Sequence, residues 1–332
     1  MKLSTKIALS LVALTALVAV ATMPQLLGSK VSAALAALAG ADPRWLAIGA
    51  GAFGVSFLAS VAAWRAALAA SGGEICARQA AARIGVGCLI NAVAPAKLGD
   101  AAKVALLAKV IDGRDRLWTV GGVYAGLGAA HGLVLAGLVV AASATGAVPL
   151  WPVFVLCAAV AVIAGVALSS TRWRGHHRLE HLFGAVAALA RSPRAGAAVL
   201  GWTAVASLAR LAAAAAVGAA LGLPSPLLAA LVILPAMDLA STIPLTPGNI
   251  GVASGAVALA LQSRGIGVTD AIGVGIAIQA LQTVVSAAAG TAGALYLARP
   301  NGAARRWAAR AAAVGVSVGF AAIVGVFVLD LV

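Results

Sequence analysis

The chain alternates long apolar stretches with short polar loops, which is the pattern of a polytopic α-helical membrane protein. A helix that crosses a bilayer needs about 20 consecutive apolar residues. About seven stretches reach that length, so we expect about seven spanning helices. They cover residues 5–27, 45–70, 117–142, 149–169, 197–222, 269–297 and 308–330.

Two further apolar stretches, residues 79–108 and 227–262, are interrupted by proline and glycine. Proline removes a backbone donor and clashes with the preceding helical turn. In lipid an unpaired backbone group costs several kcal/mol, so a break survives only where protein or a water-filled cavity surrounds it. We therefore expect two re-entrant helical hairpins. Their breaks are formed by Pro95, Gly99, Pro244, Pro247 and Gly251.

The positions of lysine and arginine give the expected orientation. With the N-terminus in the cytoplasm, 19 of the 23 basic residues fall on the cytoplasmic side, three fall outside, and Arg210 lies within a span. This is a strong positive-inside bias. It holds only if each hairpin returns to the side from which it enters. We expect a multi-pass protein of the plasma membrane with its C-terminus outside.

The order span, hairpin, span occurs twice, over residues 45–142 and 197–297, in opposite orientations. Such an inverted repeat is common among membrane transporters; two ordinary proline-kinked helices are the alternative. Residues 143–196 then form a linker with one span and a basic cytoplasmic loop, and residues 306–330 form the last helix. The whole chain, residues 1–332, is expected to be a single transmembrane domain.

Composition supports the membrane assignment and excludes several function classes. The chain is 63% hydrophobic and 10% charged, against about 45–50% and about 25% in soluble proteins. The net charge of +14 comes from basic residues in short loops. There they set orientation and contact anionic lipid headgroups, which argues against nucleic acid as a partner.

The cysteines and histidines give little support for a metal site or a cofactor. The three cysteines lack CxxC spacing, and thus suggest neither a disulfide framework nor a thiolate site. His177 and His181 have a spacing that can bind metal, but their basic surroundings favour a solvated loop. His131 lies alone in a span, where a packing role is expected. We therefore predict no metal and no cofactor.

Ionisable groups inside a membrane are costly and are functional candidates. Arg210 lies midway along its span, and Asp238 lies in the first arm of the second hairpin. Together they can form a buried ion pair, in which arginine is the permanently charged partner. Two readings stay open: the pair can be purely structural, or Arg210 can face a lipid phosphate.

Polar residues also gather at the first break. Asp100 is expected in the first turn of the second arm, where an acid suits the helix dipole. Lys97 and Lys103 can face a cavity and attract phosphate, or they can extend to the interface with their charges in water. Asn91 can satisfy backbone groups at the break.

The second break has the features of a helix start. Thr246 is a suitable N-cap and Pro247 a suitable first residue, while Gly248 and Gly251 allow close approach of the backbone. Exposed amides at a helix start bind anions. The candidate headgroup-binding residues are Asn91, Lys97, Asp100, Lys103, Arg210, Asp238, Thr246 and Gly248.

Two blocks of residues resemble the transmembrane region of the lysylphosphatidylglycerol synthase family, also called flippase-like integral membrane proteins. The resemblance covers roughly residues 45–300. The first block has Asn91, Pro95, Lys97, Gly99 and Asp100, followed by Lys103 and Lys109. The second block has Pro244, Thr246, Pro247, Gly248, Gly251 and Val252.

This resemblance implies an all-helical bundle with two re-entrant hairpins and a role in handling lipids. In the namesake enzymes this region moves lysyl-phosphatidylglycerol between leaflets, and a separate cytosolic domain attaches the amino acid. The sequence has no such domain, so we expect no lipid aminoacylation. Family members often carry an acid soon after the second Gly-Val, where this chain has Ala253 and Ser254.

We therefore expect a lipid translocase that moves an anionic phospholipid or a polyprenyl-phosphate-linked lipid through a polar cavity between the hairpins. One alternative is a non-transporting scaffold whose basic cytoplasmic loops recruit a lipid-modifying enzyme. A membrane-embedded glycosyltransferase is disfavoured because it needs a general base and often metal-binding acids. The chain has nine acids and no Asp-x-Asp, so we predict no enzymatic activity.

Overall fold

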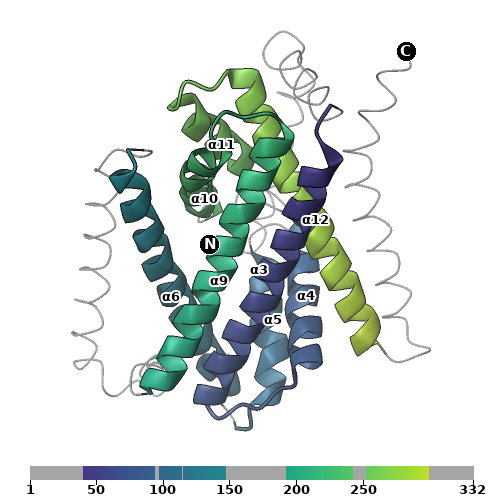
Figure 1. The fold of residues 1–332 in the computed structure, drawn as a ribbon. Coiled ribbons are helices and arrows are strands. Elements are labelled where there is room, and N and C mark those ends of the chain that lie inside the picture. Colours follow the sequence, from purple (N-terminus) through teal and green to yellow (C-terminus); the bar gives the residue numbers. More distant parts are fainter. Residues whose placement is uncertain (1–39, 94–96, 114, 147–191, 242–251, 299–332) are drawn as a thin grey trace, which may run out of the picture. The chain divides into compact units, whose positions relative to one another are not determined.

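The computed structural model describes residues 40–93, 97–113, 115–146, 192–241 and 252–298. These residues form eight α-helices and one short 3-10 helix, η2 (Ala108–Val110), and contain no strand. The α-helices are α3 (Pro43–Ala70), α4 (Ala77–Val93), α5 (Leu98–Leu107), α6 (Arg116–Ala144), α9 (Pro193–Ala220), α10 (Pro226–Ser241), α11 (Val252–Gln262) and α12 (Val268–Leu297) (Figure 1).

Four of these helices, α3, α6, α9 and α12, are long and apolar enough to cross a membrane. They contain 28, 29, 28 and 30 residues. At a rise of about 1.5 Å per residue they extend for about 42–45 Å, beyond the roughly 30 Å of a hydrocarbon core. The protein is thus a polytopic α-helical membrane protein. The other expected spans, 5–27, 149–169 and 308–330, lie outside the described residues.

The helices α3 and α9 begin in the same way. Asp42 Oδ1 accepts a hydrogen bond from the backbone N–H of Arg44 at 2.8 Å. Ser192 Oγ accepts one from the N–H of Ala195 at 3.4 Å. In both helices the first residue is proline, whose missing N–H costs nothing at a helix start. A capping side chain followed by proline therefore fixes the start of each helix.

The same two helices also end alike. Gly72 (φ +83°) follows α3 and Gly222 (φ +69°) follows α9, each in the left-handed region that favours glycine. In both cases the amide of the next residue donates to a carbonyl in the last helical turn at 2.9 Å. This arrangement satisfies a free carbonyl and stops the helix.

A pair of shorter helices follows each of these two long helices. The first pair is α4 with 17 residues and α5 with 10; the second is α10 with 16 and α11 with 11. Both pairs lie in the stretches where the sequence predicts hairpins. Four of the five predicted break residues, Pro95, Pro244, Pro247 and Gly251, lie outside the described residues.

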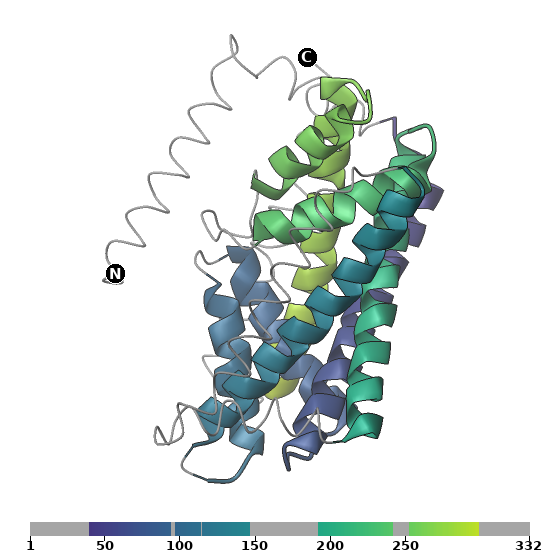
Figure 2. The ribbon, with the colours of Figure 1, turned by 90° about the vertical axis from the view of Figure 1, so that its left-hand side faces the viewer.

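The chain divides into two compact units. The first contains the described parts of residues 1–54, 84–102 and 210–332. In this unit α10 packs on α11 and α11 packs on α12, around buried side chains that include Ile233, Leu261 and Ile278. Figure 2 shows the short helices α10 and α11 beside each other near one end of α12.

Within the first unit, α12 meets two other helices at glycines. A Cβ atom on Gly290 would lie 2.7 Å from the carbonyl oxygen of Gly85 in α4, and one on Gly275 would lie 2.7 Å from that of Ser254 in α11. Side chains larger than hydrogen do not fit at these two crossings. The absence of a Cβ therefore lets α12 lie directly against one helix of each short pair.

The second unit contains the described parts of residues 55–83 and 103–209. Its fully buried side chains include Leu68, Leu107 and Val120. The rings of Trp64 and Tyr124 stack with centroids 6.1 Å apart.

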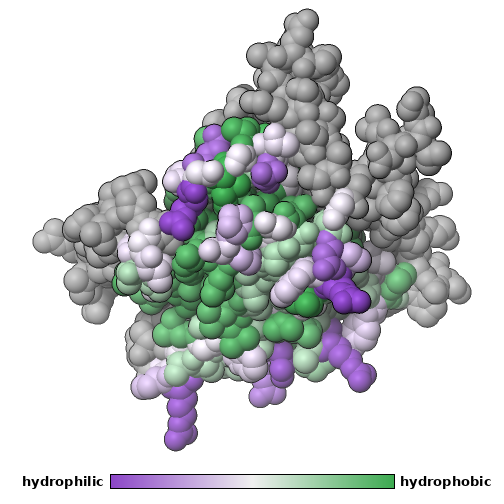
Figure 3. All heavy atoms as spheres, turned by 45° about the horizontal axis from the view of Figure 1, so that its top comes forward, coloured by the Kyte–Doolittle hydropathy of each residue, from purple (hydrophilic) through white to green (hydrophobic). Residues whose placement is uncertain are grey.

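On the face drawn in Figure 3, apolar side chains cover much of the described surface, and strongly hydrophilic ones are fewer. This surface suits a lipid environment.

Candidate functional site

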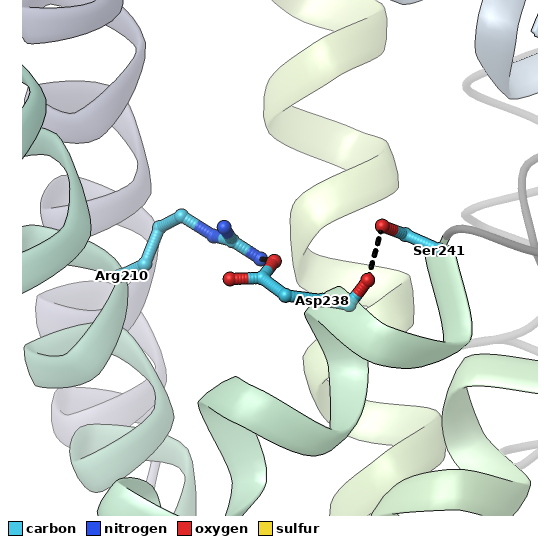
Figure 4. Close-up of polar contacts among 3 residues, drawn as sticks. All are labelled: Arg210, Asp238 and Ser241. Atoms are coloured by element: carbon cyan, nitrogen blue, oxygen red, sulfur yellow. Dashed lines mark hydrogen bonds and ion pairs between the residues drawn. The ribbon is translucent and has the colours of Figure 1, made fainter. Parts of the chain in front are cut away.

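An ion pair joins α9 to α10. Arg210 Nη2 lies 2.7 Å from Asp238 Oδ1, and the two side chains are 20% and 10% exposed. Figure 4 shows Arg210 reaching from its helix toward Asp238. The pair predicted from the sequence is therefore present. At this distance it is a charge-assisted hydrogen bond, which is stronger than a neutral one.

The backbone around Asp238 also has a local polar contact. Ser241 Oγ donates a hydrogen bond to the backbone carbonyl of Asp238 at 2.7 Å (Figure 4). Pro235 lies within the same helix, α10, where it removes one backbone hydrogen bond. The ion pair thus lies near the end of a short, proline-containing helix. We infer that it stabilises the docking of this helix end on α9.

A second group of polar residues joins α4 to α5. Asn91 Nδ2 donates a hydrogen bond to Asp100 Oδ1 at 2.9 Å. A Cβ on Gly99 would collide with the backbone oxygen of Gly87 and with the side chain of Asn91. Glycine therefore lets the start of α5 pack directly on the end of α4. Three residues proposed from the sequence, Asn91, Gly99 and Asp100, meet here.

Lys97 immediately precedes α5 and has an unusual backbone. Its φ is +56°, a left-handed conformation that costs a non-glycine residue roughly 1 kcal/mol. Its carbonyl accepts a hydrogen bond from the N–H of Asp100 at 3.0 Å, and its side chain is exposed. Lys103, one turn into α5, is half-buried. The two lysines thus differ in environment.

The remaining predicted binding residues, Thr246 and Gly248, lie outside the described residues. A cavity of about 370 Å³ lies elsewhere in the first unit. None of the predicted binding residues lines this cavity, but Asp42 and Asp270 do. Asp42 caps α3 and Asp270 lies in the first turn of α12, where acids stabilise helices. Both acids thus have local structural roles.

Arg83 is a candidate that the sequence analysis missed. From the sequence, Arg83 was assigned only as one of the cytoplasmic charges. In the structure it lies inside α4, six residues after the first residue of that helix. Its Nη1 atom is buried and has no hydrogen-bond partner among the described residues. Ser207 Oγ, on α9, is likewise buried without a described partner, and the residue is 1% exposed. The presence of arginine within an apolar stretch was the signal available in the sequence.

Comparison with known families identifies the chain. A family model described as "Lysylphosphatidylglycerol synthase TM region" matches residues 6–290, which is most of the chain. No curated protein and no solved structure matches it. The match covers both pairs of short helices, the long helices α3, α6 and α9, and most of α12. The chain therefore belongs to the lysylphosphatidylglycerol synthase transmembrane-region family.

Proposed function

We propose that this protein is a lipid translocase that moves an anionic phospholipid or a polyprenyl-phosphate-linked lipid between leaflets. The observation that carries the proposal is the polar contact between α4 and α5, where Asn91 and Asp100 are bonded beside Gly99. Discontinuous helices with polar groups at their breaks form the substrate sites of many transporters. Membership of a family whose namesakes handle lipids supports the same function.

The lengths of the short helices support a re-entrant path. α5 and α11 contain 10 and 11 residues, or about 15–17 Å, roughly half of a hydrocarbon core. We propose that each short pair enters the membrane and returns to the same side. α4–α5 would enter from the cytoplasm and α10–α11 from outside. The N-terminus would then be cytoplasmic, the C-terminus outside, and the membrane the plasma membrane.

The matched helix lengths support an inverted repeat. One series is α3, α4, α5 and α6, with 28, 17, 10 and 29 residues. The other is α9, α10, α11 and α12, with 28, 16, 11 and 30 residues. The first helix of each series also has the same kind of start and end. In the proposal, the three undescribed spans bring the number of crossings to about seven.

In this proposal the lipid headgroup crosses through a polar path between the two breaks. Lys97 and Lys103 attract its phosphate, and the backbone amides near Thr246 and Gly248 bind it after the hairpins change accessibility. Asn91 and Asp100 hold the arms of the first hairpin together. The protein performs no catalytic step and uses no cofactor. A gradient or consumption of the lipid on the receiving side drives net movement.

Purified full-length protein in liposomes tests this function. Fluorescent phosphatidylglycerol, lysyl-phosphatidylglycerol and a polyprenyl phosphate are compared by quenching with a membrane-impermeant reagent. We expect faster movement of at least one anionic lipid, and a slower rate in Lys103→Gln. Lys109→Gln is the matched control because Lys109 is exposed on η2. Folded protein that moves no lipid would contradict the translocase, and would favour a scaffold for a lipid-modifying enzyme.

A further inference from the structure

Arg83 has a buried donor that the described part of the protein leaves unused. Its Nη1 atom is buried and has no hydrogen-bond partner among the described residues. A guanidinium has five N–H donors and is always charged. Burying such a donor without an acceptor is costly, so native proteins rarely do it. An acceptor that binds from outside the chain accounts for this arrangement.

A side chain that extends to water does not explain this geometry. A long basic side chain at a membrane interface normally keeps its charged end solvated. Part of the Arg83 guanidinium is instead buried, and the residue as a whole is half-buried. By contrast, Arg78 on the same helix is exposed. Arg78 therefore has the environment expected of an interfacial arginine, and Arg83 does not.

The packing of α4 against α5 places a second cation near the same helix contact as Arg83. The end of α4 contacts the start of α5 through Gly87 with Gly99 and through Asn91 with Asp100. Both contacts therefore involve residues at the very start of α5. Arg83 lies four residues before Gly87, and Lys103 lies four residues after Gly99.

Residues four apart lie on the same face of a helix, about one turn along it. Arg83 therefore lies about one turn from Gly87 on α4, and Lys103 about one turn from Gly99 on α5, each on the helix face that makes this contact. Both belong to the second compact unit, and both are half-buried. Two cationic side chains near one helix contact attract anions.

We propose that Arg83 and Lys103 bind a phosphate-type oxyanion, which in the membrane is the phosphate of an anionic lipid headgroup. The planar guanidinium can bind two phosphate oxygens at once, and lysine adds a compact charge. This site rests on the proposed function, because it names the chemical group that the translocase would recognise. Free phosphate has the same chemistry and is the other source of the ligand.

Removal of Arg83 in the absence of ligand gives a first test. If the side chain stabilised the fold, replacing it would lower the thermal midpoint. Replacing a binding residue whose buried donor is unused should instead raise the thermal midpoint, because binding sites are held at some cost in stability. We expect Arg83→Met to raise the midpoint of the lipid-free protein in neutral detergent. A lower midpoint with unchanged ligand binding overturns the proposal.

The second test measures binding to the purified full-length chain. The probes are inorganic phosphate in neutral detergent and nanodiscs of phosphatidylglycerol or phosphatidylcholine, with native mass spectrometry or thermal protection as the readout. We expect Arg83→Gln to weaken phosphatidylglycerol binding about tenfold or more, as the loss of a charged hydrogen bond does. Arg78→Gln, the matched control, should change it less than about twofold.

Two further variants keep the test independent of one substitution. Arg83→Lys retains the charge but loses the planar fork, and Lys103→Gln leaves Arg83 intact. Each should weaken binding, by less than Arg83→Gln does. Protection by phosphatidylglycerol alone identifies a lipid headgroup; protection by inorganic phosphate that is lost in Arg83→Gln identifies free phosphate. Equal binding by the Arg83→Gln and Arg78→Gln variants overturns the site.

The binding test separates this site from the translocase. Binding that depends on Arg83, in a protein that moves no lipid in liposomes, supports the site and contradicts the proposed function. Lipid movement at equal rates in wild type and Arg83→Gln supports the function and contradicts the site.

Discussion

Arg210 and Arg83 both lie within apolar helices, but their surroundings differ. Arg210 is paired at 2.7 Å with Asp238 of the same chain. Arg83 has a buried nitrogen without a partner among the described residues. Removing one partner of a charge pair buried within the protein destabilises the fold, while a buried donor without a partner is better explained by a ligand. The comparison indicates that the position of an arginine in an apolar helix does not determine its role; its partner does.

The two pairs of short helices also carry different charged residues. The pair α10–α11 contains Asp238, which is paired with Arg210. The described charged residues of α4–α5 are Arg78, Arg83, Asp100 and Lys103, with an exposed Lys97 between the helices. We therefore infer that α4–α5 binds the anionic ligand and that the Arg210–Asp238 pair positions α10.

The largest effect is expected at Gly99, where α5 packs on α4. Gly99→Ala would place a methyl group against the backbone oxygen of Gly87, which cannot move without shifting the helix. We expect a loss of at least about 3 kcal/mol in the free energy of unfolding, at the upper end of overpacking effects, seen by thermal denaturation in detergent. Gly128→Ala is the control because its Cβ would meet nothing within 4 Å. Equal midpoints for the two variants would contradict the close packing of α4 and α5.

The next largest effect is expected at the ion pair. Arg210→Ala removes the ion-pair partner of the partly buried Asp238, so we expect a loss of about 3 kcal/mol in the free energy of unfolding. Asp238→Ala should cost a similar amount, and the double variant much less than their sum. Denaturant titration of the four proteins measures this coupling. Additive losses within about 0.5 kcal/mol would show that the pair is not an energetic unit.

A smaller effect of opposite sign is expected at the unpaired arginine. Arg83→Met removes a buried donor without a partner, so stability should rise by about 1 kcal/mol. The single variant Arg210→Met, made in the wild-type protein, should lower the stability. The sign of the two shifts, measured in lipid-free detergent, is the sharpest stability test of the comparison. Two shifts of the same sign would remove the distinction between these arginines.

The smallest effect is expected at Lys97, whose φ of +56° suits glycine better than lysine. Lys97→Gly should raise stability by about 0.5–1 kcal/mol, or by less because glycine gains freedom in the unfolded chain. The substitution also removes an exposed charge. Thermal denaturation and lipid transport measured on the same preparation therefore separate the backbone effect from the charge effect. A destabilised variant would contradict the left-handed conformation.

The long helices were predictable because apolar length alone determines them. The span expected over residues 45–70 corresponds to α3, Pro43–Ala70, whose start is displaced by the Asp42 cap and Pro43. The Arg210–Asp238 pair was also predictable, because few ionisable residues lie inside apolar stretches and each needs a partner.

The contacts of α4 were harder to predict. The bond between Asn91 and Asp100 depends on how two helices pack, which is not a local property of the sequence. The crossing at Gly85 and Gly290 was hidden because the chain has 38 glycines. Arg83 was missed because a basic residue near a helix end also serves as a topology signal. Only the burial of its Nη1 atom distinguishes it.

The most direct test of this account is the rate at which an anionic lipid crosses liposome membranes that contain the folded Arg83→Gln or Arg78→Gln protein. The account predicts that Arg83→Gln slows the movement of fluorescent phosphatidylglycerol about tenfold or more, while Arg78→Gln stays within about twofold of wild type. Equal rates in the two variants, in a protein that does move the lipid, would show that the unpaired arginine has no part in recognising the headgroup.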